Sequence, residues 1–240
     1  MNLKEKENFI EKEDSMRKDY CKDYEGRCSR SHEIETDFSP EEIENWGKRI
    51  FVVSGPPGSG KDTVVEECMK KDAKLEYFIP MTTRQARPGE KDIRYHFEDA
   101  QTFENQMDKD EFLFWQDHGK DAEGNQKYYG IKNSDLRETL TNSDNDVVIT
   151  VGGICGSMEI KRIFPKSTCI FISPSSLETL EKQIRGRGTD SNKEIELRLK
   201  EGQTMMKYKD LYDFAITNVY GELDKTVETA LKTIQERRER

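Results

Sequence analysis

The stretch IFVVSGPPGSGKDT, residues 50–63, decides the fold of this chain. The apolar, β-branched run RIFVVS at 49–54 is typical of a buried parallel strand. A glycine-rich turn and a lysine come next, and VVEECMKK at 64–71 is good helix-forming sequence. A strand, a glycine-rich loop and a helix in this order are the context in which such a loop binds phosphate.

The loop contains the groups that an anion needs. Gly55, Gly58 and Gly60 allow the backbone to wrap closely, so that successive N–H groups point at one phosphate. Lys61 adds a positive charge, and the helix behind it adds the partial positive charge of its N-terminus. The alternative is a plain strand-to-helix turn with an exposed lysine, but the agreement of all four features favours a phosphate site.

One position in the loop departs from the usual pattern, in which Gly-x-x-x-x-Gly-Lys is followed by Ser or Thr. Here Asp62 follows the lysine, and Thr63 comes only after it. A carboxylate therefore replaces the hydroxyl that normally ligates Mg²⁺. Asp62 either holds Mg²⁺ itself or repels phosphate.

The rest of the chain continues the alternation of strands and helices. Further β-rich runs lie at 146–151, 168–173 and 213–217, with helical sequence between and after them. This order predicts an α/β fold, with a parallel sheet flanked by helices on both faces. Residues 77–131 break the alternation, because Tyr, Phe and Trp are combined there with turn signals, and they indicate a small β-rich insertion.

Composition limits the partners of the chain. Of its 240 residues 36% are charged, and the net charge of −9 argues against binding to nucleic acid or to an anionic membrane. No stretch approaches the roughly 20 apolar residues of a membrane span, and the first residues lack the apolar core of a signal peptide. Five widely spaced cysteines suit free thiols in a reducing compartment. We therefore expect a soluble, cytoplasmic protein.

The acidity is concentrated in residues 1–48, which hold 14 Asp/Glu and 9 Lys/Arg. This segment has few apolar residues and no sustained period, so we expect a charged, flexible N-terminal extension before a folded domain at 49–240. Near the end of the segment, Ser39, Pro40 and two glutamates predict the N-cap and first turn of a short helix.

A second cluster of candidate site residues follows the loop. The segment MTTRQARPGE contains Arg84 and Arg87, and Tyr95 and Tyr129 lie further along the chain. Arginine offers paired planar donors and tyrosine offers a hydroxyl, so these side chains together can hold a phosphate monoester.

A third cluster lies in the segment IRGRGTD. Arg187 stands there between two glycines, and Arg198 lies in the charged helical sequence beyond. A glycine-hinged loop that carries arginines is what a lid closing over phosphates needs. Each arginine alone is typical of a solvated surface, but the set behind a phosphate loop indicates a donor site, an acceptor site and a lid.

In the order and spacing of these motifs, the chain from about residue 50 to 231 resembles the guanylate kinase family. The matching landmarks are GPPGSGK, TTRQARPGE, FLFW, YYG, FISPSSLETL and RGRGTD. The resemblance implies a three-layer P-loop kinase fold, with an acceptor-binding insertion at about 77–131 and an arginine-bearing lid at about 184–198. It also implies transfer of the ATP γ-phosphoryl group to a phosphate monoester, with Mg²⁺ between the phosphates.

By position, the resemblance assigns a role to each motif residue. Catalysis would depend on Lys61, Arg187 and Arg198. The acceptor phosphate would be held by Arg84, Arg87, Tyr95 and Tyr129. The ATP site would consist of Gly55, Pro56, Pro57, Gly58, Ser59, Gly60, Lys61, Asp62, Thr63 and Asn218, with Asp62 as the candidate Mg²⁺ ligand.

The positions that read guanine in this family differ here. Phe114 replaces the acid before the Trp of FLFW, and Ile131 replaces the Ser or Thr after YYG. Neither side chain can hydrogen-bond a base, and burying a polar base edge unpaired is costly. Gln116 or His118 could supply a new contact, although such residues more often lie at the surface.

Three hypotheses about function stay open. The first is a kinase of a nucleoside monophosphate, GMP or dGMP by resemblance. The second is a kinase of another phosphorylated acceptor, such as ribose 1,5-bisphosphate, and the third is a catalytically silent binding module. The partners expected are ATP and a small phosphorylated acceptor, and the sequence is silent on the oligomeric state.

Overall fold

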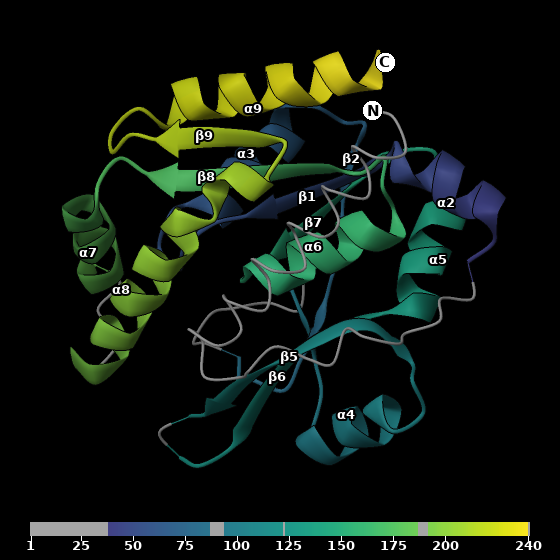
Figure 1. The fold of residues 1–240 in the computed structure, drawn as a ribbon, viewed down its shortest axis with the longest axis horizontal. Coiled ribbons are helices and arrows are strands. Elements are labelled where there is room, and N and C mark those ends of the chain that lie inside the picture. The colour runs from purple at the N-terminus through teal and green to yellow at the C-terminus, as the bar shows by residue number, and fades with distance from the viewer. Residues whose placement is uncertain (1–37, 87–93, 122, 187–191, 240) are drawn as a thin grey trace.

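The computed structural model describes residues 38–86, 94–121, 123–186 and 192–239 (Figure 1). Its centre is a five-stranded sheet of order β2-β7-β1-β8-β9, in which every neighbouring pair is parallel. The strands are β1 (Ile50–Ser54), β2 (Leu75–Tyr77), β7 (Asp146–Val151), β8 (Thr168–Pro174) and β9 (Phe214–Asn218). The predicted α/β fold is confirmed, and the run that precedes the glycine-rich loop forms the middle strand.

Helices cover both faces of this sheet, because successive side chains of a strand point to opposite faces. Phe51 of β1 belongs to a core cluster shared with α3 (Lys61–Lys71) and α9 (Leu223–Arg238). Val52, the next residue, belongs to the other cluster, which includes α6 (Ile154–Ile163). Figure 1 shows α9 running along β9, with α6 on the opposite side of the sheet.

A second, four-stranded sheet of order β4-β3-β6-β5 lies between β2 and α5 (Asn133–Asn142) in the chain. Its strands are β3 (Met81–Thr82), β4 (His96–Phe97), β5 (Phe112–Lys120) and β6 (Gln126–Lys132). β5 and β6 form an antiparallel hairpin. Helix α4 (Ala100–Met107) packs there through Phe103, whose ring stacks on Phe112 at 4.3 Å between centroids. This sheet is the lower layer of Figure 1.

Two further helices lie beyond the carboxyl ends of β8 and β9 (Figure 1). α7 (Leu177–Gly186) and α8 (Asn192–Lys207) pack on each other through Leu180, Ile184 and Ile195. A 3-10 turn at Lys209–Leu211 then leads into β9. The carboxyl edge of a parallel sheet is where ligands of α/β proteins bind, so these helices border the expected site.

A short helix, α2 (Pro40–Gly47), precedes β1 and begins as predicted. The Ser39 hydroxyl accepts a hydrogen bond from the Glu42 N–H at 3.2 Å, and the Glu42 carboxylate accepts one from the Ser39 N–H at 2.6 Å. Phe38 is buried in the core beneath the Arg137 guanidinium, 4.7 Å from the ring centroid. The folded part therefore reaches back into the segment expected to form the N-terminal extension.

The cysteines only partly follow the expectation of free thiols. Cys68 and Cys169 are free and buried, and burial raises the pKa of the Cys68 thiol to about 11. Cys155, near the start of α6, is disulfide-bonded, so the expectation is wrong for this residue. No helix in the described ranges is long and apolar enough to cross a membrane.

Candidate functional site

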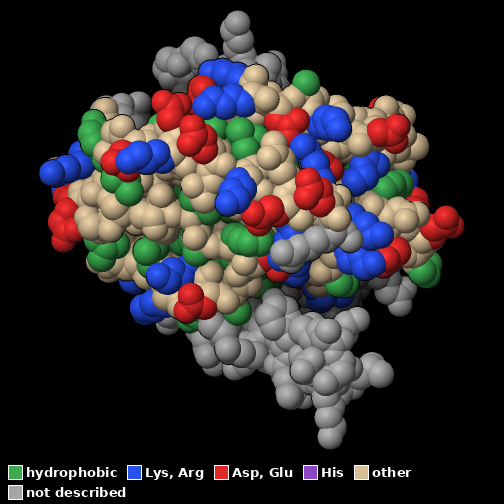
Figure 2. Space-filling model, turned by 90° about the horizontal axis from the view of Figure 1, so that it is seen from above, with side chains coloured by type: hydrophobic (Ala, Val, Ile, Leu, Met, Phe, Trp, Pro, Cys, Tyr) green, Lys and Arg blue, Asp and Glu red, His purple; other side chains and the backbone are tan. Residues whose placement is uncertain are grey.

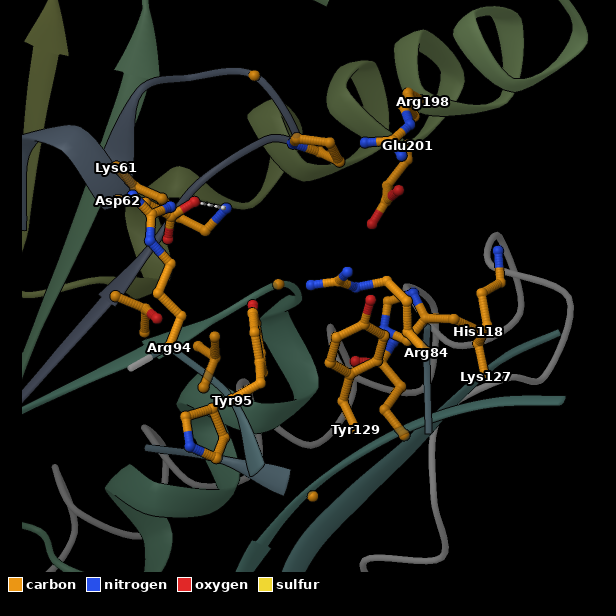
Figure 3. A pocket seen from close by; sticks show the side chains of 18 of the residues that line it. Lys61, Asp62, Arg84, Arg94, Tyr95, His118, Lys127, Tyr129, Arg198 and Glu201 are labelled. Atoms are coloured by element: carbon orange, nitrogen blue, oxygen red, sulfur yellow. Dashed lines mark ion pairs between the residues drawn. The ribbon is translucent and has the colours of Figure 1, made fainter. Parts of the chain in front are cut away.

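A cavity of about 330 Å³ lies between the glycine-rich loop, the end of β7, the hairpin β5–β6 and helix α8. Each of these elements contributes side chains to it (Figure 3). The lining includes Pro57, Gly58, Lys61, Asp62, Arg84, Arg94, Tyr95, Phe114, Gln116, His118, Lys127, Tyr129, Ile131, Thr150, Glu194, Arg198, Lys200 and Glu201. Candidate residues from the loop, the insertion and the lid helix therefore face one space.

The glycine-rich loop has the backbone shape that its glycines predict. Gly60 has φ of +83° where α3 begins, and a Cβ there would lie 2.5 Å from Nδ2 of Asn218. Gly55 has φ of +155°, and a Cβ there would lie 2.2 Å from the carbonyl oxygen of Ile172. Only glycine fits these two positions, so the loop packs directly against β8 and β9.

Asn218 holds this loop instead of lining the cavity. Its Nδ2 donates a hydrogen bond to the Ser59 carbonyl at 2.9 Å, and its Oδ1 accepts one from the Thr226 hydroxyl at 3.1 Å. The side chain is 7% exposed, with both polar ends engaged. The Asn218 amide is therefore not free to hydrogen-bond the adenine base, and it supports the loop backbone instead.

Lys61 and Asp62 begin helix α3 and face the cavity together (Figure 3). The Lys61 ammonium lies 3.9 Å from Oδ2 of Asp62, and the side chains are 13% and 36% exposed. The loop thus presents one cation and one carboxylate, instead of a cation and a hydroxyl.

Arg94 is a lining residue that the sequence analysis missed. It reaches the Asp62 side of the cavity from the chain just before β4 (Figure 3), and its guanidinium forms an ion pair with Glu66 of α3. The available signal was its place next to Tyr95, a candidate residue, but its pairing with a helix 28 positions earlier in the chain is not readable from local sequence.

Three of the candidate acceptor residues do meet in space. The Arg84 guanidinium lies 5.2 Å from the centre of the Tyr95 ring, and the Tyr95 and Tyr129 rings meet edge to face at 5.7 Å. Burial, and then the neighbouring Tyr129, raise the pKa of Tyr95 far above its usual value. Its phenol therefore stays a proton donor at neutral pH. Arg87 lies outside the described residues.

Helix α8, whose first turns belong to the predicted lid, lines the opposite wall. Arg198 and Glu201 extend from it toward the cavity (Figure 3), and Glu194 lines the same wall. Arg187 falls between α7 and α8, outside the described residues.

The two altered base-reading positions belong to the hydrophobic core. Phe114 is 6% exposed and Ile131 is 2% exposed, and both are members of the cluster that includes α6. The Phe114 ring lies against Gly156 of α6, where a Cβ would be 2.8 Å from the ring carbon Cε1. These side chains form an apolar floor to the cavity instead of a hydrogen-bonding one.

Gln116 is not at the surface, where residues of its type more often lie. It is 2% exposed and lines the cavity, and its Nε2 finds no hydrogen-bond partner among the described residues. The sequence feature that places Gln116 on the cavity face is strand alternation, because residues two apart in a strand share a face and Phe114 is a candidate site residue. His118 lies further along the same face, with its ring 4.8 Å from that of Tyr129.

The charged side chains that line the cavity are mostly basic. Of the described charged side chains that line it, six are Lys or Arg and three are Asp or Glu. On the face shown in Figure 2 the two signs are interspersed instead. A small anionic ligand is therefore favoured inside the cavity, although the chain as a whole is acidic.

A glycine-rich loop at the carboxyl edge of a parallel sheet, opening into a cavity lined mostly by basic side chains, is typical of P-loop phosphotransferases. A family model described as guanylate kinase matches residues 47–237. The chain belongs to the guanylate kinase family.

Individual relatives agree with this assignment. The chain is 35% identical over 189 residues to a guanylate kinase of Prochlorococcus marinus subsp. pastoris, covering 78% of this chain and 97% of the relative. It is 38% identical over 170 residues to one of Carboxydothermus hydrogenoformans, covering 70% and 79%. The solved guanylate kinase of Anaplasma phagocytophilum has the same fold, with a TM-score of 0.58 and 21% identity over 80% of this chain and 86% of that one.

The chain is therefore an enzyme, a phosphotransferase of the nucleoside monophosphate kinase class that uses ATP and Mg²⁺. The described residues contain no cluster of three His, Cys, Asp or Glu side chains that could hold a metal by themselves. Mg²⁺ commonly binds through one or two carboxylates plus substrate phosphates and keeps several waters. Asp62, partly exposed toward the cavity, offers such a carboxylate.

Proposed function

We propose that the chain transfers the γ-phosphoryl group of ATP to a guanine nucleoside monophosphate, GMP or dGMP. The observation that carries the proposal is that two groups of candidate phosphate-binding residues face one cavity from different walls. Lys61 and the glycine-rich loop form one, and Arg84 with Tyr95 and Tyr129 forms the other. The names of the relatives supply the guanine acceptor.

In the donor half, the loop N–H groups and Lys61 bind the ATP phosphates, and the start of α3 adds its dipole. We assign the loop residues 55–63 to this site, with Asn218 holding the loop in shape. Asp62 is the proposed Mg²⁺ ligand, and Mg²⁺ held there would supply positive charge to the phosphates during transfer.

In the acceptor half, Arg84, Arg87, Tyr95 and Tyr129 hold the acceptor phosphate. Arginine pairs with two phosphate oxygens and the phenols donate further hydrogen bonds. The half-buried Tyr95 keeps its proton, which suits a donor to phosphate. These contacts place the attacking phosphate oxygen of the acceptor in line with the γ-phosphoryl group of ATP. Such alignment, together with electrostatic stabilisation, provides most of the catalysis in phosphoryl transfer.

In the lid, Arg187 and Arg198 stabilise the charge that develops on the transferred group. We take 184–198 as this lid and 77–131 as the acceptor-binding insertion of a domain that begins near residue 49. A charge-neutralising lid also excludes water, so that ATP is not hydrolysed in the absence of acceptor. We propose that the enzyme acts in the cytoplasm on these small molecules, without binding nucleic acid or membrane.

The test is an acceptor screen with the full chain, ATP and Mg²⁺, following ADP release. GMP, dGMP, AMP, CMP, UMP, dTMP and ribose 1,5-bisphosphate are compared, with Lys61→Ala as the inactive control. Turnover of GMP and dGMP above the others supports the proposal. Turnover of ribose 1,5-bisphosphate alone, or ATP binding without turnover of any acceptor, overturns it.

A further inference from the structure

The mechanism above does not use the amide of Gln116, a buried polar group on the acceptor wall. The residue lies within β5 and pairs in register with Tyr129 of β6. It is 2% exposed, it lines the cavity, and its Nε2 finds no partner among the described residues. A buried N–H donor without an acceptor is costly, and such groups are rare unless a ligand satisfies them.

Gln116 shares one face of β5 with Phe114 and His118, since all three line the cavity. Phe114 and Ile131 beside it are apolar and offer no hydrogen bond. Gln116 is therefore a polar group at the edge of an apolar floor, the arrangement that orients a flat, partly polar ring.

The described carboxylates that line the cavity come from other walls. Asp62 belongs to α3, and Glu194 and Glu201 belong to α8 (Figure 3). The Thr150 hydroxyl at the end of β7 already pairs with the Tyr77 hydroxyl at 2.6 Å. On the described part of the acceptor wall, the free buried donor that remains is the Gln116 amide.

We propose that the Gln116 carboxamide reads the base of the acceptor through two hydrogen bonds. Its Nε2–H donates one to the carbonyl at position 6 of the purine ring, and its Oε1 accepts one from the adjacent ring N–H. This inference rests on the proposed function and extends its acceptors from guanine nucleotides to IMP. A carboxylate can only accept, so it reads the ring N–H together with the exocyclic amine of guanine. A carboxamide reads the carbonyl and the ring N–H, and it leaves the exocyclic amine unread.

The substrate class is then the 6-oxopurine nucleoside monophosphates. GMP, dGMP and IMP share the carbonyl and the ring N–H, whereas AMP lacks both. We expect the kcat/KM values for GMP and IMP to agree within about threefold. Removal of the carbonyl is expected to lower kcat/KM about 10-fold to 100-fold, because the buried amide again lacks an acceptor.

The experiment crosses three acceptors with the variants of one residue. GMP, IMP and the monophosphate of 2-aminopurine riboside, which keeps the amine but lacks the carbonyl, are assayed with the wild-type chain, Gln116→Leu and Gln116→Glu. Gln116→Leu should lower kcat/KM for GMP and IMP about 10-fold to 100-fold through KM, and should leave the 2-aminopurine compound within about threefold. Gln116→Glu should favour GMP over IMP by at least about 10-fold, because a carboxylate needs the N–H donors.

The control is His118→Ala, on the same face of the same strand, which should change all three acceptors by a similar factor. Thermal unfolding confirms that each variant is folded, and if Gln116→Leu does not fold, the GMP-to-IMP ratio of Gln116→Glu decides alone. A wild-type preference for GMP over IMP above about 30-fold, or a carbonyl dependence that survives Gln116→Leu, overturns the inference while the proposed function stands. Failure of the wild-type chain to use any of the three overturns both.

Discussion

Replacing Gly156 by alanine tests whether Phe114 is committed to the core in place of a base-reading acid. Gly156 lies within α6, and its α-carbon faces the Phe114 ring. An added methyl carbon would stand 2.8 Å from Cε1 and 3.3 Å from Cδ1 and Cζ of that ring. Ordinary carbon–carbon contacts are about 3.5–4.0 Å, so the ring or the helix must move by several tenths of an ångström.

The expected change in stability is a difference between two opposing terms. Alanine in a helix interior gains about 1 kcal/mol over glycine. Overpacking a core costs about 1–3 kcal/mol, and the Phe114 ring has little freedom to withdraw because it is 6% exposed. We expect Gly156→Ala to be destabilised by about 1 kcal/mol, which lowers Tm by about 2–4 °C in a domain of this size.

Thermal unfolding followed by circular dichroism measures this change. Gly186→Ala is the matched control, because Gly186 ends α7 and a Cβ there meets nothing within 4 Å; its Tm should stay level or rise. Adding Phe114→Leu to Gly156→Ala should recover part of the loss, since the smaller side chain frees the space. An equal Tm for Gly156→Ala and the control, or no recovery in the double variant, would refute the packing argument.

Three further predictions concern the proposed phosphate-binding residues and the C-terminal helix α9. Lys61→Ala should lower the rate of ADP release at least about 100-fold and change Tm by less than about 2 °C, because this side chain serves the ligand; retained activity would contradict the loop assignment. Arg84→Lys should raise KM for the acceptor about 10-fold and leave KM for ATP unchanged, since lysine cannot bind two phosphate oxygens at once as arginine does. A larger rise of KM for ATP than for the acceptor would contradict the assignment of Arg84 to the acceptor site. Arg238 binds Asp72 and Asp146, and Arg238→Ala should cost about 1–2 kcal/mol at pH 7 in urea unfolding. Burial opposes ionisation of Asp72, but the Lys74 N–H and Arg238 outweigh it, so its folded pKa lies below 3.8. That contribution is present above the unfolded pKa and is lost as pH falls through the folded one, so the difference between wild type and variant should shrink at pH 3.

The parts of the molecule that could be predicted from sequence are those fixed by neighbouring residues. The loop and β1 follow from glycine, lysine and an apolar run within one short stretch, and the cap at Ser39 needs only its next three residues. The strands of the second sheet were visible only as a β-rich region. β3 and β4 are two residues each, and they exist through pairing with distant segments instead of through local propensity.

The site shows the same limit. The chemistry of Phe114 could be read from the sequence, but its contact with Gly156 could not, because two segments far apart in the chain meet there. Arg94 was missed for the same reason, since Glu66 lies on another element. Gln116 is different, because strand alternation from Phe114 is sufficient to place it on the cavity face, whereas its residue type alone favours the surface.

The hydrogen bond from Asn218 to the Ser59 carbonyl has a consequence for how the enzyme is made. The two residues are 159 positions apart, so a growing chain completes its nucleotide loop long before the residue that clamps it has been synthesised. β9 is also the last strand of the sheet along the chain, and it lies at the edge beside β8. A nascent or truncated chain that ends after α8 would carry the whole loop motif without the clamp. If the loop binds ATP as proposed, we expect such a chain to bind ATP more weakly than the full chain, because the Ser59 carbonyl lacks its hydrogen bond from Asn218.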